Sequence, residues 1–265
     1  MAIVIDTISP VAFSVFGIDI RWYALAYIAA FVVGYVLLRR FTSRPDSVIK
    51  LSKQNLDDLL TAVVFGVIIG GRLGYVLFYN LSYFISHPLE ILAVWHGGMS
   101  FHGGLLGVIV ATLLFARRHR INALSILDLM AVVAPLGLFF GRIANFINHE
   151  VMGRPTDAPW GVVFAGDTLI PRHPSPLYEA ATEGILLFVI MYLLYRYTSL
   201  QRRAGALGGI MCMGYAVFRI FCEQFRAPDT QIGFLVGDWL TMGMLLSVAM
   251  FIIGVCVFAH AMRKK

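Results

Sequence analysis

Seven long apolar stretches confine this chain of 265 residues to a fold that crosses a membrane. An α-helix needs about 20 largely apolar residues to cross the hydrocarbon layer of a bilayer. Six stretches meet this length, and a seventh is shorter and follows a glycine-rich segment. The predicted spans are residues 20–38, 59–78, 101–116, 128–146, 177–195, 207–225 and 239–258. Charged residues make up only 14% of the chain, against about 25% in soluble domains. We therefore predict an all-α integral membrane protein with seven transmembrane helices.

Lysine and arginine lie mostly on one side of this arrangement. Three of the 21 basic residues fall in segments on the opposite side, namely Arg154, Arg172 and Arg226. Fourteen follow spans 1, 3, 5 and 7: Arg39, Arg40, Arg44, Lys50, Lys53, Arg117, Arg118, Arg120, Arg196, Arg202, Arg203, Arg263, Lys264 and Lys265. Cytoplasmic loops carry the excess of Lys and Arg, so we expect the N-terminus outside and the C-terminus in the cytoplasm. We expect a single polytopic membrane domain over residues 1–265, with a small outer-face segment at about 147–176.

The net charge of +6 reflects these loops. Basic residues are not interleaved with aromatic ones in the way that nucleic-acid binding requires, so no nucleic-acid partner is predicted. The first basic residue is Arg21, and we therefore expect no cleaved signal peptide. The three cysteines, Cys212, Cys222 and Cys256, lie in apolar stretches and are interpreted as small buried hydrophobic residues.

Several glycines within the spans are four residues apart. Such pairs allow helix backbones to approach closely, which matters where lipid removes the hydrophobic drive for helices to associate. We expect close helix packing at Gly66, Gly70, Gly74, Gly103, Gly107, Gly137 and Gly141.

Charged residues also occur inside the predicted spans, all in the outer half of the membrane. They are Arg21, Arg72, Arg142, Arg219, Glu179, Glu183 and Glu223. Charges at this depth are costly and normally face the bundle interior or a wet cavity. Arg21 and Glu183 also fit simple snorkelling or ion pairing. We interpret the set as the lining of a polar cavity.

Helical spacing groups the polar residues further. Tyr215, Arg219 and Glu223 share one face of the sixth span, with Arg226 close by. Arg142 and Asn145 share a stripe at the outer end of the fourth span, which His149 extends. Converging guanidinium groups suit a phosphate, and nearby carboxylates keep them oriented.

The segment from His96 to Gly104, HGGMSFHGG, places glycine pairs after two histidines. Paired glycines let a backbone fold back and expose its groups to a cavity. A neutral His102 beside an arginine cluster is a candidate general base, and the alternative is a hydrogen-bonded packing residue. His96, His102, His149 and His173 lack a familiar metal-ligand spacing. No metal or other cofactor is predicted.

These residues leave two functions open: an enzyme that acts on a phospholipid, or a carrier for an organic anion. Carriers usually contain two-fold internal repeats with interrupted helices. We find no such repeat in the sequence.

Four blocks of the chain resemble the prolipoprotein diacylglyceryl transferase family of the bacterial cytoplasmic (inner) membrane. They are residues 96–105 (HGGMSFHGGL), 141–165 (GRIANFINHEVMGRPTDAPWGVVFA), 172–181 (RHPSPLYEAA) and 214–230 (GYAVFRIFCEQFRAPDT). The likeness runs from about residue 21 to the seventh span. It implies the first step of lipoprotein maturation, in which the diacylglyceryl group of phosphatidylglycerol is transferred to the lipobox cysteine thiol of a prolipoprotein. The products are a thioether and glycerol 1-phosphate, and the active site faces the periplasm. The partners implied are phosphatidylglycerol, the prolipoprotein signal peptide and membrane lipids.

The resemblance also implies roles for individual residues. His102, Arg142, Arg219 and Glu223 are the expected catalytic residues. The expected substrate-binding residues are Tyr23, Arg142, Asn145, Glu150, Gly153, Tyr215, Arg219 and Arg226. Arg142 and Arg219 would stabilise the departing phosphate, and Glu150 and Glu223 would orient the arginines. The base is His102, Glu223 or an Arg–Glu pair.

Three features depart from the family pattern. His149 replaces a small residue, and Met244 stands where a glutamine is usual in the seventh span. The outer segment after Pro155 is also short.

Overall fold

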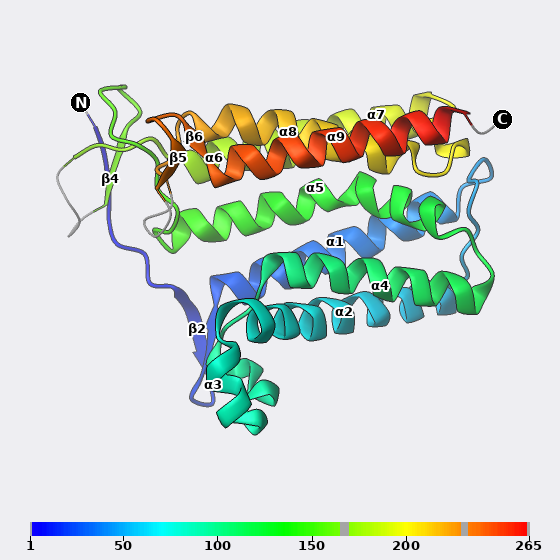
Figure 1. The fold of residues 1–265 in the computed structure, drawn as a ribbon, viewed down its shortest axis with the longest axis horizontal. Coiled ribbons are helices and arrows are strands. Elements are labelled where there is room, and N and C mark those ends of the chain that lie inside the picture. The colour runs from blue at the N-terminus through cyan, green and yellow to red at the C-terminus, as the bar shows by residue number, and fades with distance from the viewer. Residues whose placement is uncertain (1, 165–169, 229–232, 264–265) are drawn as a thin grey trace. The chain divides into compact units, whose positions relative to one another are not determined.

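The computed structural model describes residues 2–164, 170–228 and 233–263, and its fold is drawn in Figure 1. This described part contains seven helices that are long and apolar enough to cross a membrane, which confirms the predicted all-α, seven-span fold. They are α1 (Trp22–Thr42), α2 (Lys53–Tyr79), α4 (Phe101–His119), α5 (Ala123–Ile147), the continuous span Ser175–Tyr197, α8 (Ala206–Glu223) and α9 (Met242–Arg263). The orientation of the termini stays a prediction.

Shorter elements connect the spans. The helical ones are α3 (Leu81–Ser86), η1 (Pro88–Leu92), η2 (Val94–His96) and η4 (Leu200–Arg202). The strands are β1 (Ile3–Ile5), β2 (Val11–Val15), β3 (Ile18–Arg21), β4 (Val162–Phe164), β5 (Phe234–Val236) and β6 (Leu240–Thr241). Strands β1 and β4 pair in parallel, whereas β2–β3 and β5–β6 are antiparallel pairs. Parts of the predicted outer segment (165–169) and of the family-like block 214–230 (229–230) lie outside the described residues, as do Lys264 and Lys265.

Strand pairing corrects two predicted helix starts. The first span was predicted from residue 20, but β3 pairs with β2 up to Arg21 and α1 begins at Trp22. Arg21 is therefore an exposed strand residue, and its placement inside a span was wrong. The seventh span likewise begins at Met242 because residues 240–241 form β6.

The chain divides into two compact units. One comprises the chain up to Leu37 and from Asp128 onward, and the other comprises Leu38–Leu127. The single polytopic domain stays a prediction, and each unit is described by itself below.

In the unit Leu38–Leu127, α2 and α4 lie side by side (Figure 1). A Cβ on Gly70 would lie 2.4 Å from the carbonyl oxygen of Gly103, and one on Gly107 only 1.9 Å from that of Gly66. These backbones could not approach so closely with any side chain at those positions, which confirms the predicted glycine packing here. At Gly141, by contrast, a Cβ would meet no heavy atom within 4 Å, so close packing was wrong at that position.

In the other unit, α8 and α9 lie side by side (Figure 1). A Cβ on Gly209 or on Gly254 would lie 2.8 Å from the other glycine's carbonyl oxygen. The start of α8 is capped from α5, because the Asp128 carboxylate accepts hydrogen bonds from the backbone N–H groups of Gly205 and Gly208, both at 2.7 Å. An acceptor there satisfies donors that a helix N-terminus otherwise leaves unpaired. These contacts fix the register of α8, the helix that carries Arg219.

Candidate functional site

Three arginines and three glutamates form one cluster in the unit that contains α5 to α9. The members are Arg142 of α5, Glu179 at the end of α6 (Ser175–Glu179), Glu183, Arg219 and Glu223 of α8, and Arg226 just beyond α8. We call these six residues the charge cluster. It brings together four of the residues predicted to bind or act on the substrate: Arg142, Arg219, Glu223 and Arg226.

Glu179 is the centre of the charge cluster. Its Oε2 lies 2.8 Å from Nε of Arg142, and its Oε1 lies 2.8 Å from Nη1 of Arg219. The same Oε1 is 3.3 Å from Nη1 of Arg226. The Glu179 side chain is fully buried. The three arginines therefore replace water as the partners of its carboxylate.

Glu183 adds a second bridge between the same helices. Its Oε2 lies 3.3 Å from Nη2 of Arg142, and its Oε1 lies 3.7 Å from Nη1 of Arg219. Its helix between α6 and α7 (Leu187–Tyr197) is a π-helix, η3, over Ala180–Leu186. A π-helical segment is rare and occurs often at functional sites. Both glutamates were interpreted as part of the lining of a polar cavity, but neither was predicted to have a catalytic or binding role, although their spacing of four residues places them on one helical face.

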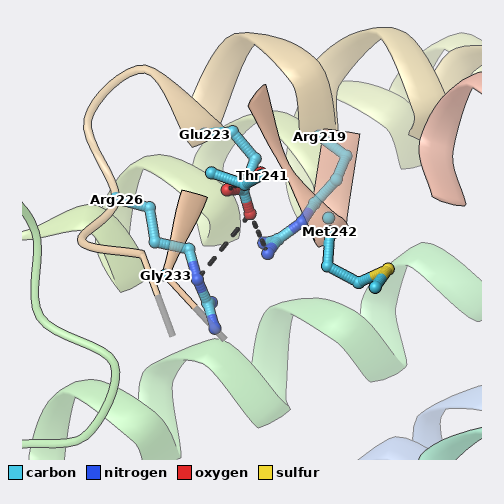
Figure 2. Close-up of a pocket in the computed structure, with 7 residues that line it drawn as sticks. Arg219, Glu223, Arg226, Gly233, Thr241 and Met242 are labelled. Carbon is cyan, nitrogen blue, oxygen red and sulfur yellow. Dashed lines mark hydrogen bonds and ion pairs between the residues drawn. The ribbon is translucent and has the colours of Figure 1, made fainter. Parts of the chain in front are cut away.

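Glu223 lies between Arg219 and Arg226 in the charge cluster. Its Oε1 contacts Nη2 of Arg219 and lies 3.7 Å from Nε of Arg226, and its Oε2 accepts a hydrogen bond from the Thr241 hydroxyl at 2.8 Å. Figure 2 shows Glu223 between the two arginines. They line a small pocket together with Thr241, Gly233, Met242 and Gly243.

The three arginines and three glutamates of the charge cluster give it a formal net charge of zero. Arg142, Arg219 and Arg226 retain 18%, 11% and 14% side-chain exposure, whereas the three glutamates retain 3% or less. Each guanidinium has five N–H donors. An arginine that is oriented by carboxylates can therefore still direct its remaining donors at a ligand. The partly exposed arginines around buried carboxylates suit the binding of a phosphate.

Three other predicted residues form a separate hydrogen-bonded network. The Tyr23 hydroxyl of α1 donates to Oε2 of Glu150 at 3.1 Å, and Nδ2 of Asn145 donates to the same oxygen at 3.1 Å. Asn145 Nδ2 also donates to the Tyr23 hydroxyl. Within the described residues no ion pair joins Glu150 to an arginine. The expectation that Glu150 orients the arginines therefore differs from the structure, in which Glu179 and Glu183 hold Arg142.

The turn that carries Glu150 is strained on both sides. His149 and Val151 have φ of 57° and 59°, a region that residues other than glycine seldom adopt and that is most costly for a β-branched residue. His149 lies beyond the end of α5, where Nε2 accepts from the Ile8 N–H at 3.5 Å and the ring stacks on Phe164 at 3.8 Å. The predicted extension of the Arg142 stripe to His149 was therefore wrong.

Gly153 lies where two other segments meet. A Cβ at this position would lie 2.4 Å from the carbonyl oxygen of His173 and 2.6 Å from that of Phe225. Next to it, the Arg154 guanidinium donates to the carbonyl oxygen of Arg226 at 2.9 Å. Burial of its ring lowers the pKa of the nearby His173 imidazole below its ordinary value. The glycine thus allows the outer segment to hold the end of α8 in place.

His102 belongs to the other unit, so its position relative to the charge cluster stays a prediction. It is the exposed second residue of α4, directly after Phe101. Ser100 begins this helix, because its hydroxyl accepts from the Gly103 N–H at 3.2 Å.

Arg72, predicted to face the polar cavity, instead binds the backbone of its own unit. Its guanidinium donates to the carbonyl oxygen of Ile91 at 2.9 Å and to that of Gly97 at 2.6 Å, with Glu90, Gly98 and Ala93 as further acceptors. The group also lies over the Phe84 ring at 5.0 Å. Arg72 therefore holds the segment that precedes His102, and its contacts are those of a structural residue.

Two remaining predicted positions flank the cluster. Tyr215 lies one turn before Arg219 in α8, partly buried. Met244 lies in the first turn of α9, where its N–H donates to the Thr241 hydroxyl at 3.2 Å. Among the residues that the structure describes, no three His, Cys, Asp or Glu side chains form a group suited to a metal ion.

Comparisons with known proteins agree with this arrangement. The family model described as prolipoprotein diacylglyceryl transferase matches residues 10–260. A phosphatidylglycerol–prolipoprotein diacylglyceryl transferase of Rhodospirillum rubrum is 51% identical over 265 residues, covering 100% of this chain and 96% of that protein. Proteins of the same name from Azospirillum brasilense and Methylocella silvestris are 52% and 49% identical, covering 100% and 97% of this chain and 98% and 95% of those proteins.

Proposed function

Because the chain belongs to the prolipoprotein diacylglyceryl transferase family, we propose that it transfers the diacylglyceryl group of phosphatidylglycerol to the lipobox cysteine thiol of a prolipoprotein. The names of its full-length relatives contain both substrate classes. The reaction yields a thioether and glycerol 1-phosphate and is the first step of lipoprotein maturation.

The chemistry is a substitution at carbon. The cysteine sulfur attacks the glycerol carbon that bears the phosphate ester, a C–S bond forms, and the C–O bond to the phosphate breaks. The electron pair of that bond leaves with the phosphate, and the thiol proton passes through a base to balance the charge. A thiol with a pKa of about 8.5 is mostly protonated at pH 7, so a base assists the formation of the thiolate.

The charge cluster is the observation that carries this proposal. The phosphate gains negative charge as the C–O bond breaks, and Arg142 and Arg219 are preorganised to stabilise that charge. Glu179 contacts both arginines at 2.8 Å and so fixes the direction of their donors. Arg226 contacts the same carboxylate and completes a three-sided anion site.

His102 is the proposed base, supported by its match to the family's histidine. Glu223 is the alternative. Both of its oxygens already accept hydrogen bonds, one from Arg219 and one from Thr241, which favours the orienting role for this carboxylate. We assign substrate binding to Tyr23, Asn145, Glu150, Gly153 and Tyr215, whose polar groups and backbone lie at the same end of α5 and α8 as the arginines.

We further propose that the enzyme is a multi-pass protein of the bacterial inner membrane with its active site toward the periplasm. The excess of basic residues after spans 1, 3, 5 and 7 supports this orientation. A reporter that functions only outside the cytoplasm should be active when it is inserted near Asp157 and silent after Lys265. The reverse result would contradict the proposed orientation.

Reconstitution of the purified protein tests the proposed function. Protein, phosphatidylglycerol vesicles and a lipobox peptide should yield the thioether and glycerol 1-phosphate without added nucleotide or metal, and a chelator should not change the rate. A peptide with serine in place of the lipobox cysteine is the control. Anion flux into the vesicles without a covalent product would instead support a carrier and contradict the enzyme.

A further inference from the structure

The Glu223 carboxylate is held from two sides by two different elements, helix α8 and strand β6. Arg219 of its own helix contacts Oε1, and the Thr241 hydroxyl donates to Oε2 at 2.8 Å. Glu223 and Thr241 are 2% and 4% exposed. The terminal torsion of a glutamate is broad, so a contact with one oxygen leaves the carboxylate free to turn about that contact. The second hydrogen bond removes this freedom.

The Thr241 hydroxyl has two roles at once. Thr241 is the residue before α9, and its oxygen accepts the Met244 N–H at 3.2 Å. A hydroxyl carries one hydrogen, and an ionised carboxylate can only accept. The hydroxyl hydrogen of Thr241 must therefore be donated to Glu223, while a lone pair of the same oxygen accepts the Met244 N–H and caps α9.

Gly243 provides the space for the other carboxylate oxygen. A Cβ at this position would lie 2.6 Å from Oε1 of Glu223 and 3.5 Å from Nη2 of Arg219. Any side chain at 243 would therefore force the Glu223 carboxylate to shift from this position. Further along the same two helices, the close approach of Gly209 and Gly254 fixes α9 on α8, which keeps the start of α9 in place against Glu223.

We propose that the start of α9 is a positioning element for the transferase reaction, in which Thr241 and Gly243 fix the Glu223 carboxylate and through it the guanidinium of Arg219. Figure 2 shows Thr241 beside Glu223 at the pocket. Thr241 is a positioning residue, because its hydroxyl acts through Glu223 and Arg219. The inference rests on the proposed function, since it assigns Arg219 to the leaving phosphate.

Variants of Thr241 separate positioning from helix capping. Thr241→Val keeps the shape and loses both bonds, and Thr241→Ser keeps both. Thr241→Asn and Thr241→Asp have the same size and both cap a helix well, but only the amide can donate to Glu223. Ser247→Ala is the matched control, because Ser247 is a buried hydroxyl of α9 that donates to the Gly243 carbonyl oxygen at 2.7 Å and has no bond to the charge cluster.

The measurement is kcat and KM for phosphatidylglycerol, per molecule of inserted and folded protein. Thr241→Val should lower kcat by about tenfold to a hundredfold, as expected when one hydrogen bond to a charged group is lost, and should change KM less than threefold. Thr241→Ser should restore most of the rate, Thr241→Asn should exceed Thr241→Asp, and Ser247→Ala should resemble the wild type.

Two results would overturn the positioning role: a wild-type kcat for Thr241→Val, or equal rates for the Asn and Asp variants, which would reduce Thr241 to a helix cap. Neither result is confused with failure of the proposed function, because in that case the wild-type protein itself would form no thioether.

Discussion

Replacement of Arg219 by lysine is the most direct test of the charge cluster. Lysine keeps the positive charge but has a single nitrogen in place of a planar fork. In the structure, Nη1 lies 2.8 Å from Oε1 of Glu179 while Nη2 contacts Glu223. One ammonium group cannot contact both carboxylates and a phosphate in the same directions. Because the residue is only 9% exposed, bulk water does not replace the missing donors.

The size of the effect follows from the role assigned to this guanidinium. Removal of one preorganised donor to a developing oxyanion costs about 2.7–4 kcal/mol, or roughly 10²–10³ in kcat. The phosphate of the lipid carries less charge in the ground state than in the transition state, so the loss should fall mainly on kcat and less on KM. We expect Arg219→Lys to insert and fold and to lose at least about 10²-fold in turnover.

The assay is thioether formation per inserted molecule, with the melting temperature measured on the same preparation. Arg203→Lys is the matched control, because Arg203 donates to the Met262 carbonyl oxygen at the other end of the same two helices. This variant should keep its rate. Near-normal turnover of Arg219→Lys, or a loss that only follows the amount of folded protein, would refute the reasoning and leave Arg219 as a packing residue.

Three further substitutions test other contacts. Glu179→Gln removes the negative charge that three arginines share. It should lower the free energy of unfolding by about 3–5 kcal/mol, as for a broken buried ion pair, and should reduce turnover per folded molecule more than tenfold. An unchanged melting temperature in detergent would contradict this expectation. Gly153→Ala places a methyl group against two carbonyl oxygens and should cost about 1–3 kcal/mol, again read from the melting temperature. Arg72→Lys should remove several hydrogen bonds to partly buried carbonyl groups and speed limited proteolysis within residues 87–99, whereas a wild-type cleavage rate would show that Arg72 does not hold this segment.

The sequence predicted the membrane fold well because hydropathy is a local property. Twenty apolar residues in a row have few alternatives to a transmembrane helix, and all seven spans are present in the described part of the chain. The predicted helix starts were wrong where hydrogen-bonded pairing between two segments decides whether residues form a strand or a helix. Residues 18–21, IDIR, alternate apolar and charged side chains, and their pairing with Val11–Val15 makes them a strand and moves Arg21 out of the span.

The site was predicted in its residue types more than in its contacts. Arg142, Arg219, Glu223 and Arg226 were identified from depth and helical spacing, and they do meet. The partners were harder to predict. Glu179 and Glu183 were interpreted as part of the lining of a polar cavity, but nothing local indicates which arginines of the two other helices they contact or that a π-helix follows Glu179.

Arg72 shows the opposite case. Its depth in a span was the same signal that identified Arg142, and only the structure reveals the loop carbonyls that bind it. A buried arginine can be satisfied either by carboxylates or by a set of backbone oxygens. Depth in the membrane therefore predicts that an arginine has partners, and the fold decides whether those partners leave it available to a substrate.

The balance of the charge cluster bears on how binding energy is used. A cluster of three unpaired arginines would already bind the singly charged phosphatidylglycerol tightly before the reaction, and binding energy that is spent on the ground state does not raise kcat. Three buried glutamates that pair with these arginines reduce the attraction for the singly charged lipid. They also hold the guanidinium groups in fixed directions, so that no reorganisation is needed when the phosphate gains its second charge. The neutral cluster is therefore better suited to a leaving group whose charge grows during the reaction than an exposed patch of arginines would be.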